Sequence, residues 1–305
     1  MQPGKHNVRI GTSGWSYDDW CGIVYPDRGG FDRLAYLAGY FDTFEVNSSF
    51  YRPPPAGMSA SWLRRTPERV DFALKLHRRF THERDQPYTR SEVDTFRRGI
   101  DPIFQAGRLV ALLAQFPWSF RFDEQARFWL EQLARDFRRY PMVVEVRHAG
   151  WMAIEAVDFL RDRKLNIAAI DQPELPRNLP AVLEPTGPMG YVRLHGRNKE
   201  QWFASAGTAQ HTEAERRAAR NARYDYLYTP AELEEWAGRI VELAGKTERT
   251  YVFANNHFGG QAPANALQLK AMLAREKVPV PELMIGAFGF LAEIARTTQR
   301  QGRLF

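Results

Sequence analysis

The chain has 305 residues, of which 44% are apolar and 26% charged, with a formal net charge of +6. This length suits one large α/β domain or two small ones, and the composition excludes disordered and fibrous proteins. A single cysteine, Cys21, excludes an internal disulfide framework and a cysteine-cluster zinc site, so we expect a reducing, cytoplasmic location. Neither a signal-peptide segment nor an 18-residue apolar window is found, so we expect neither secretion nor membrane insertion.

Eight short apolar segments with alternating character predict β-strands. In chain order they cover residues 8–15, 43–49, 71–77, 108–116, 141–148, 166–172, 190–196 and 250–256. Helical spacing occurs between most of them, at 32–41, 90–104, 123–137, 153–163 and 229–243, the last opening with a Thr-Pro pair. This alternation predicts a TIM-type (β/α)8 barrel over residues 1–280, followed by a carboxyl-terminal extension over 281–305.

Two connections depart from the regular pattern. The proline-rich segment 171–188 cannot hold a regular helix, and residues 197–228 form a long polar insertion after the seventh strand. The rival architecture is a doubly wound open sheet. It is disfavoured because no G-x-G-x-x-G or Walker sequence follows the first strand.

Polar residues recur two positions apart near the ends of the predicted strands. The pairs are Glu45 with Asn47, Lys75 with His77, Glu145 with Arg147, and Arg193 with His195, and the residues between them are apolar. Gln115, Asp171 and Asn255 hold comparable late positions on other strands. Because alternate side chains share a face of a strand, we expect a polar lumen and an active site at the carboxyl ends of the strands.

The charges in this set balance, with Lys75, Arg147 and Arg193 against Glu45, Glu145 and Asp171. One reading is a purely structural ion-pair network. A second is a divalent-metal site using His77, Glu145, Asp171, His195 and His257, although three nearby cations would repel the metal. We therefore expect no metal or other cofactor and favour a receptor for phosphate or carboxylate.

The motifs GTSGWSYDDW, TFEVNSSFYRPP, LKLHRRFTHERD, LLAQFPWSF, VEVRHAGW, YVRLHG, RYDYLYTPAELEEWA and FANNHFGGQAPANALQL resemble those of the YecE-like family, known as domain of unknown function 72. The resemblance implies a TIM-type barrel and no settled activity. Its recurrent positions repeat most of the lumenal set and add His82, whereas His77 falls outside them.

We expect an enzyme acting on a phosphate-containing or otherwise anionic substrate, nucleic acid included, by metal-independent acid/base chemistry. In this scheme Lys75, Arg147 and Arg193 hold the anion, Glu45 or Glu145 is the general base, and His195 or His82 is the general acid. Asp171 completes the catalytic set. The expected substrate-binding residues are Trp15, Tyr17, Asn47, Tyr51, Arg52, His82, Gln115, His148, Trp151, Asn255 and Asn256.

Two alternatives stay open: a non-catalytic nucleic-acid or nucleotide-binding protein, and a metal-dependent sugar isomerase or phosphodiesterase related to endonuclease-type barrels. The last five residues, QGRLF, also resemble the peptide by which bacterial DNA-processing proteins bind the sliding clamp, through Gln301, Leu304 and Phe305. A frayed or self-docked terminus is the competing interpretation of that segment.

Overall fold

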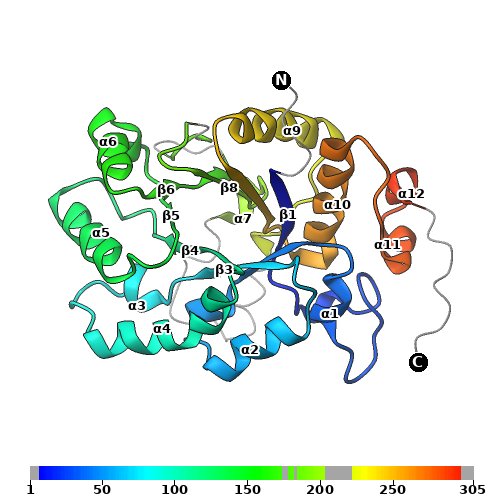
Figure 1. Cartoon of the computed structure of the whole chain (residues 1–305). Coiled ribbons are helices and arrows are strands. Elements are labelled where there is room, and N and C mark those ends of the chain that lie inside the picture. Colours follow the sequence, from blue (N-terminus) through cyan, green and yellow to red (C-terminus); the bar gives the residue numbers. More distant parts are fainter. Residues whose placement is uncertain (1–6, 174–177, 182–183, 203–221, 297–305) are drawn as a thin grey trace.

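The computed structural model describes residues 7–173, 178–181, 184–202 and 222–296. Its strands form one parallel sheet that curls around a central axis (Figure 1). In sheet order they are β6 (Asn166–Ile167), β5 (Met142–Glu145), β4 (Leu109–Gln115), β3 (Asp71–Lys75), β2 (Thr43–Val46), β1 (Val8–Ser13), β9 (Arg249–Ala254), β8 (Met189–Leu194) and β7 (Ala169–Asp171). Every one of the eight predicted strands is present.

The sheet closes through the sixth predicted strand, which is split at Ala168 into β6 and β7. The first part pairs with β5 and the second with β8. The amide of Ala168 donates to the carbonyl of Val144 at 2.9 Å. The two ends of the sheet, β6 and β7, are therefore separated in the chain by this one residue. The structure is therefore a nearly closed barrel and confirms the predicted TIM-type fold.

Helices surround the strands (Figure 1). They are α1 (Arg33–Leu37), α2 (Ala56–Arg64), α3 (Arg78–Thr81), α4 (Arg90–Gln105), α5 (Glu124–Asp136), α6 (Ile154–Asp162), α7 (Lys199–Trp202), α9 (Pro230–Gly245), α10 (Gln261–Ala274), α11 (Glu282–Ala287) and α12 (Leu291–Ile294). Short 3-10 turns follow several strands, namely η1 (Asp18–Trp20), η2 (Ser48–Phe50), η3 (Ala149–Met152) and η5 (Phe258–Gly260). The five predicted helices are confirmed, and α11 and α12 lie outside α10.

Capping boxes explain why two long helices begin where they do. The Thr229 hydroxyl accepts from the amide of Glu232, the Glu232 carboxylate accepts from the amide of Thr229, and Pro230 occupies the first turn of α9. Thr89 and Glu92 repeat the arrangement at α4. Such caps satisfy backbone amides that have no partner within the helix. No helix in the described ranges is long and apolar enough to cross a membrane.

The two irregular connections, 171–188 and 197–228, are described in part. Within residues 172–173, 178–181 and 184–188 there is no regular helix between β7 and β8. The amide of Leu179 donates to the carbonyl of Arg147 at 2.7 Å, which joins this connection to the end of β5. The insertion after β8 contains α7 and returns at residue 222 before α9.

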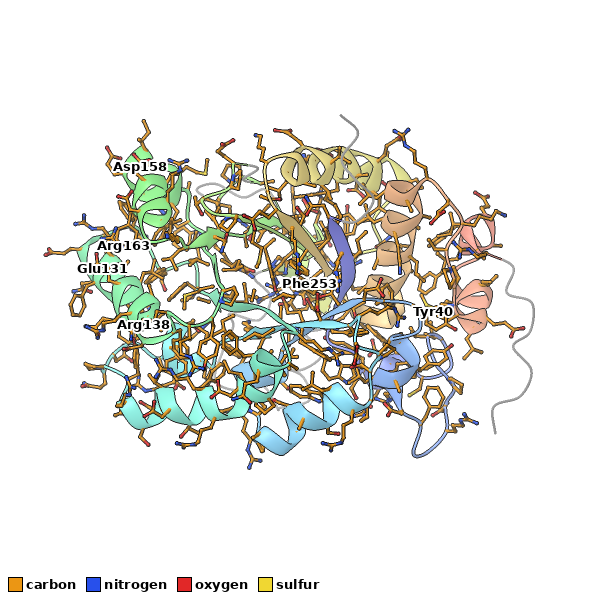
Figure 2. The ribbon with its side chains drawn as sticks, viewed as in Figure 1. Tyr40, Glu131, Arg138, Asp158, Arg163 and Phe253 are labelled. Carbon is orange, nitrogen blue, oxygen red and sulfur yellow. The ribbon has the colours of Figure 1, made fainter. Side chains whose placement is uncertain are left out.

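Two layers of different polarity fill the barrel interior. An apolar cluster separate from the main core contains Ala73, Leu113, Val143, Tyr191 and Phe253, and Figure 2 shows Phe253 inside the ring of strands. These residues alternate with those that face the helices, so they belong to the lumen. The expectation of a polar lumen is correct for the layer at the carboxyl ends of the strands, and the layer beneath it is apolar. Charged side chains return at the amino ends, where Arg9 Nη1 pairs with Asp71 Oδ2 at 2.6 Å.

Two glycines in long helices test how tightly α4 is packed. A Cβ at Gly99 would lie 2.1 Å from the Pro54 carbonyl oxygen, whereas one at Gly238 in α9 would meet nothing within 4 Å. We expect Gly99→Ala to lower the free energy of unfolding by about 1–3 kcal/mol through overpacking. Gly238→Ala should raise it by up to about 1 kcal/mol through helix propensity. Urea unfolding followed by circular dichroism measures both, and an unchanged Gly99→Ala protein would contradict the close approach.

Candidate functional site

Three fully buried charges form the centre of the polar layer: Glu45 on β2, Glu145 on β5 and Arg193 on β8. Arg193 donates two hydrogen bonds to Glu45 in a bidentate pair, from Nε to Oε2 at 2.9 Å and from Nη2 to Oε1 at 2.6 Å. Its remaining terminal nitrogen, Nη1, donates to Glu145 Oε2 at 2.5 Å. One guanidinium thus bridges two carboxylates from opposite sides of the lumen.

Glu45 is saturated with hydrogen-bond donors. Beside the two nitrogens of Arg193, it accepts from the Ser13 hydroxyl at 2.7 Å and from the Tyr191 hydroxyl at 2.7 Å, so each carboxylate oxygen has two donors. A general base needs a lone pair that can reach the substrate. Glu45 therefore fits an anchoring role for Arg193 better than the expected role of general base.

Glu145 is held by cationic and imidazole neighbours. Arg147 Nη2 donates to its Oε1 at 2.9 Å, and His195 Nε2 lies 3.5 Å from the same oxygen. Burial by itself would raise the pKa of Glu145, but Arg193 and His195 hold it well below its usual range. The carboxylate stays ionised across the physiological pH range.

His195 is a buried, neutral member of the layer. Its Nδ1 lies 2.8 Å from the side-chain amide nitrogen of Asn255, and its Nε2 lies 3.3 Å from Arg193 Nη1 and 3.5 Å from Glu145 Oε1. Burial, assisted by the charge of Arg193, lowers the pKa of His195 to about 4. It lies within the buried layer, where we had expected His195 or His82 to be the general acid.

Lys75, at the end of β3, is partly exposed whereas Glu45, Glu145 and Arg193 are fully buried. Its Nζ lies 4.2 Å from the centroid of the Phe50 ring. Within the described part of the chain, no hydrogen bond or ion pair holds this amine. Desolvation, reinforced by Arg193, lowers the pKa of Lys75 to about 7.

Arg147 lies at the rim of this layer, with 14% of its side chain exposed. Arg223 and Tyr224, from the segment that returns after the insertion, approach the same region. Tyr224 packs 6.4 Å from His195 and 4.8 Å from His257, between ring centroids. Sequence reasoning missed both residues. The motif RYDYLYTPAELEEWA was recognised, but neither residue lies on a strand, so strand alternation could not place them.

Tyr17, Asn47 and His82 border the mouth. The Tyr17 hydroxyl donates to the Ser13 carbonyl at 2.6 Å, interacts with the side chain of Asn47, and its ring stacks on His257 at 4.5 Å. The His82 ring packs edge-on against Phe50 at 4.9 Å. Partial burial and the charge of Lys75 lower the pKa of His82.

Asp171 lies outside the charged layer, contrary to expectation. Ala168 and Ile170 face the lumen, whereas Ile167 and Ala169 belong to the helix-facing core. Alternation therefore turns Asp171 outward, where both its oxygens accept from Arg197 Nε at 3.0 Å. Its late position on the sixth strand suggested otherwise, because both faces of this strand carry apolar residues and the sequence does not show which face points into the lumen.

Three expected substrate-binding residues serve the core instead. Trp15 follows the left-handed Gly14 and packs edge-on against Phe44 and Trp62, at 5.8 and 5.6 Å. Trp151 is fully buried, and its indole nitrogen donates to the Phe120 carbonyl at 2.8 Å. Asn256 is also fully buried and donates to the Tyr226 carbonyl and to Asn265 Oδ1, each at 2.8 Å.

The remaining expected binding residues occupy different depths. Gln115 is buried and donates to the Phe116 carbonyl at 2.7 Å, and His148 accepts from the Gly150 amide at 3.0 Å while its ring contacts Trp118. Tyr51 and Arg52 are exposed after β2. They are rim positions rather than parts of the buried layer.

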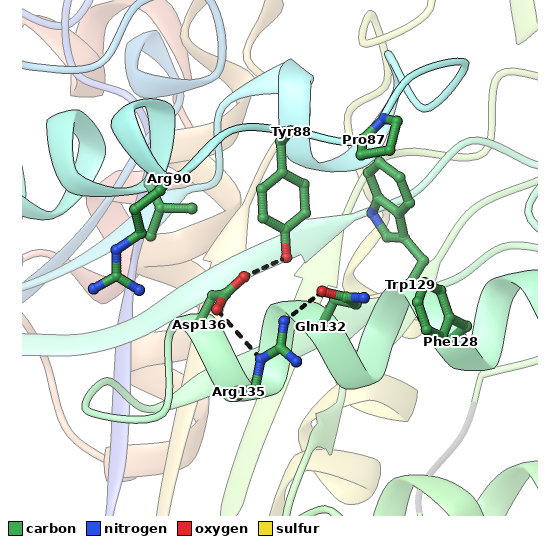
Figure 3. A pocket seen from close by; sticks show the side chains of 9 residues that line it. Pro87, Tyr88, Arg90, Phe128, Trp129, Gln132, Arg135 and Asp136 are labelled. Carbon is green, nitrogen blue, oxygen red and sulfur yellow. Dashed lines mark hydrogen bonds and ion pairs between the residues drawn. The ribbon is translucent and has the colours of Figure 1, made fainter.

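A cavity of about 590 Å³ lies outside the barrel, between α5 and the segment that leads into α4 (Figure 3). Tyr88 donates to Asp136 across it at 2.9 Å, and the Trp129 indole donates to the Phe80 carbonyl at 2.7 Å. None of the expected site residues lines it. The polar layer and this cavity are therefore separate features.

Two further expectations concern a metal site and the carboxyl-terminal tail. Among those residues, no group of three or more His, Cys, Asp or Glu side chains is placed to hold a metal ion. The carboxylates of the polar layer face guanidinium and hydroxyl donors instead. Gln301, Leu304 and Phe305, expected to bind a sliding clamp, lie outside the described residues.

Comparisons with known proteins agree with the motifs. A family model described as "Protein of unknown function DUF72" matches residues 9–284. The UPF0759 protein YunF of Bacillus subtilis (strain 168) is 28% identical over 276 residues, 87% of this chain and 94% of that protein. A DUF72 family protein of Thermotoga maritima MSB8 is 34% identical, with a TM-score of 0.74, covering 88% of this chain and 100% of that one. One from Enterococcus faecalis V583 is 22% identical with a TM-score of 0.74, covers 88% of this chain and 95% of that one, and supports the fold alone.

The titration of Lys75 provides the first test of the site. We expect competitive acetylation, read by peptide mass spectrometry, to show half-maximal reactivity of Lys75 near pH 7. Exposed Lys246 is the internal control, because Glu184 and Glu242 raise its pKa. If Lys75 reacts only in parallel with Lys246 as the pH rises, the amine is charged at neutral pH and this description of the layer is wrong.

The bridging role of Arg193 provides the second test. Arg193→Met leaves two buried carboxylates without their main donor and should lower the free energy of unfolding by about 3–5 kcal/mol. Arg197→Met should cost less, because 28% of the Arg197 side chain is exposed.

The folded-state pKa of Glu145 lies below its unfolded value, so its stabilising contribution is present above about pH 4 and lost at lower pH. Urea unfolding from pH 3 to 7 should show the wild-type advantage over Arg193→Met shrinking below about pH 4. A constant advantage, or equal losses in the two arginine variants, would contradict the bridge.

Proposed function

This chain belongs to the DUF72 family of proteins, and we propose that it is an enzyme acting on an anionic substrate at the carboxyl-end mouth of its barrel. The observation that supports this most strongly is the amine of Lys75. Lys75 is a half-buried residue at the mouth, its amine has a lowered pKa, and within the described residues the amine contacts only the face of Phe50. Amines of this kind serve enzymes as bases and nucleophiles.

The local charges explain why Lys75 differs from its neighbours. With Asp171 paired to Arg197 outside the layer, the two carboxylates Glu45 and Glu145 are engaged by the guanidiniums of Arg193 and Arg147. Arg223 adds a further positive charge beside Arg147. A protonated Lys75 increases this excess of positive charge in a desolvated environment, so its deprotonation, which gives the reactive form of the amine, is favoured near neutral pH.

The anion-binding side of the proposal rests on Arg147 and Arg223. Burial, together with the positive charge of Arg147, lowers the pKa of Arg223, so the two guanidiniums are close enough to repel each other. A phosphate or carboxylate bound at both would relieve that repulsion and accept charge-assisted hydrogen bonds. Glu145 in turn orients Arg147 through the 2.9 Å contact.

In the proposed reaction the neutral amine of Lys75 takes a proton from, or attacks, the bound substrate. Arg147 and Arg223 hold the anionic group and stabilise negative charge as it develops. Arg193, Glu45 and His195 keep the layer rigid from below and do not touch the substrate. These assignments change the expected scheme, in which Arg193 bound the anion and the glutamates acted as bases.

Turnover measurements test this function. We would incubate the protein in chelator with phosphate esters, sugar phosphates, oxo acids and short DNA and RNA oligonucleotides, and follow products by proton and phosphorus NMR. We expect at least one anionic compound to react, with a rate that rises with pH through about 7 as Lys75 loses its proton. Lys75→Met should lower kcat roughly 100-fold or more.

Arg147→Met should mainly raise KM, by roughly 10-fold or more, since one charge-assisted contact is lost. Exposed Lys246→Met is the matched control and should retain wild-type rates. Wild-type turnover by Lys75→Met, or the absence of both turnover and Arg147-dependent binding across the panel, would refute the proposal.

A further inference from the structure

We propose that the substrate carries an aldehyde or ketone close to its anionic group, and that Lys75 Nζ bonds to that carbonyl carbon as an imine. This inference deepens the proposed function and rests on it. It assigns the substrate class, a small oxo acid or phosphorylated carbonyl compound, and it distinguishes covalent catalysis from simple proton transfer.

The surroundings of Lys75 suit a nucleophile. The nearby carboxylates are occupied: Glu45 by Arg193, Ser13 and Tyr191, and Glu145 by Arg193, Arg147 and His195. Within the described residues, no hydrogen bond or ion pair ties the lysine amine to either carboxylate. A lone pair that is not engaged in a salt bridge remains available to attack an electrophilic carbon.

The ring of Phe50 lies close enough to Lys75 Nζ to stabilise a positive charge on this nitrogen. Nζ is 4.2 Å from the ring centroid, within the range of a cation–π contact. An iminium carries the same single positive charge on the same atom as the ammonium. Converting the protonated lysine into the iminium therefore changes no net charge in the layer.

The reaction balances without a further reagent. The neutral amine forms the N–C bond while the carbonyl π electrons move to oxygen, and a proton then passes from nitrogen to that oxygen. The C–O bond breaks after a second protonation, releasing water and leaving the iminium. Overall, protonated Lys75 and the carbonyl compound yield the iminium and one water molecule, with no oxidant or reductant.

The two arginines of the proposed anion site are electrostatically linked to the lysine. The positive charge of Arg147 contributes to the lowered pKa of both Lys75 and Arg223, and Arg147 Nη2 donates at 2.9 Å to Glu145, whose charge also acts on Lys75. In the proposed arrangement the anionic group binds at Arg147 and Arg223 while the carbonyl of the same molecule faces Lys75 Nζ. This arrangement favours small molecules whose carbonyl and anionic groups are separated by few bonds.

Borohydride trapping tests the inference, because it reduces an imine to a stable secondary amine. We would treat the intact protein with sodium borohydride in the presence of pyruvate, glyoxylate or glyceraldehyde 3-phosphate, with acetone and unphosphorylated glyceraldehyde as matched neutral probes. Peptide mass spectrometry would locate the adducts. We expect at least one anionic probe to label Lys75 at least 10-fold more than its neutral counterpart.

Two other lysines serve as internal controls. Lys270 is largely buried but donates to the Tyr40 carbonyl at 2.7 Å, and Lys246 is exposed and paired with Glu184 at 3.0 Å. Both should remain at least 10-fold less labelled than Lys75. Lys75→Arg, which keeps the charge, should remove the mouth adduct, and Arg147→Met should lower labelling by anionic probes at least 10-fold.

A second measurement, made without borohydride, distinguishes the two proposals. It is the shift in the unfolding temperature that pyruvate or inorganic phosphate causes. A preferential Lys75 adduct supports the imine. An Arg147-dependent shift without any Lys75 adduct overturns the imine and leaves the proposed function standing. The absence of both overturns both, and labelling spread equally over Lys75, Lys246 and Lys270 also overturns the imine.

Discussion

The bridge that Arg193 forms between Glu45 and Glu145 is the interaction on which the mouth of this barrel depends. The three residues come from β8, β2 and β5, which are not neighbours in the sheet, so the contact crosses the lumen rather than following a hydrogen-bonded strand pair. Ionised groups at this depth are stable only when each finds its partner. Tyr191 and Ser13 complete the donors, and the layer becomes rigid.

That rigidity has a chemical consequence. Because the glutamates are occupied and Asp171 is paired elsewhere with Arg197, Lys75 has no carboxylate of its own in the described structure. An unmatched amine in a desolvated site loses its proton easily. The structural network and the reactive group are thus two results of one charge balance, and the apolar layer beneath them keeps water out from below.

Much of the fold was predictable from local pattern. Alternating apolar residues indicated all eight strands, and the Thr-Pro pair indicated the start of α9. Helices α10 and α2 were not predicted, because the apolar residues of their sequences do not form an amphipathic pattern. Helix α10 is buried on nearly all sides and is rich in alanine, and α2 contains mostly small residues with only Ser59 and Trp62 buried. A helix packed between layers has no polar face to reveal it.

The sequence by itself determined the barrel, the order of its strands and the chemical types at their carboxyl ends, because these follow from alternation over a few residues. Only the tertiary structure decided which charges meet. Arg193 joins Glu45, 148 residues away, and Arg223 and Tyr224 reach the mouth from a segment without strand register. Trp15 and Trp151 turn into the core. Such pairings depend on distances across a closed lumen and on how loops return over it, and no local pattern encodes them.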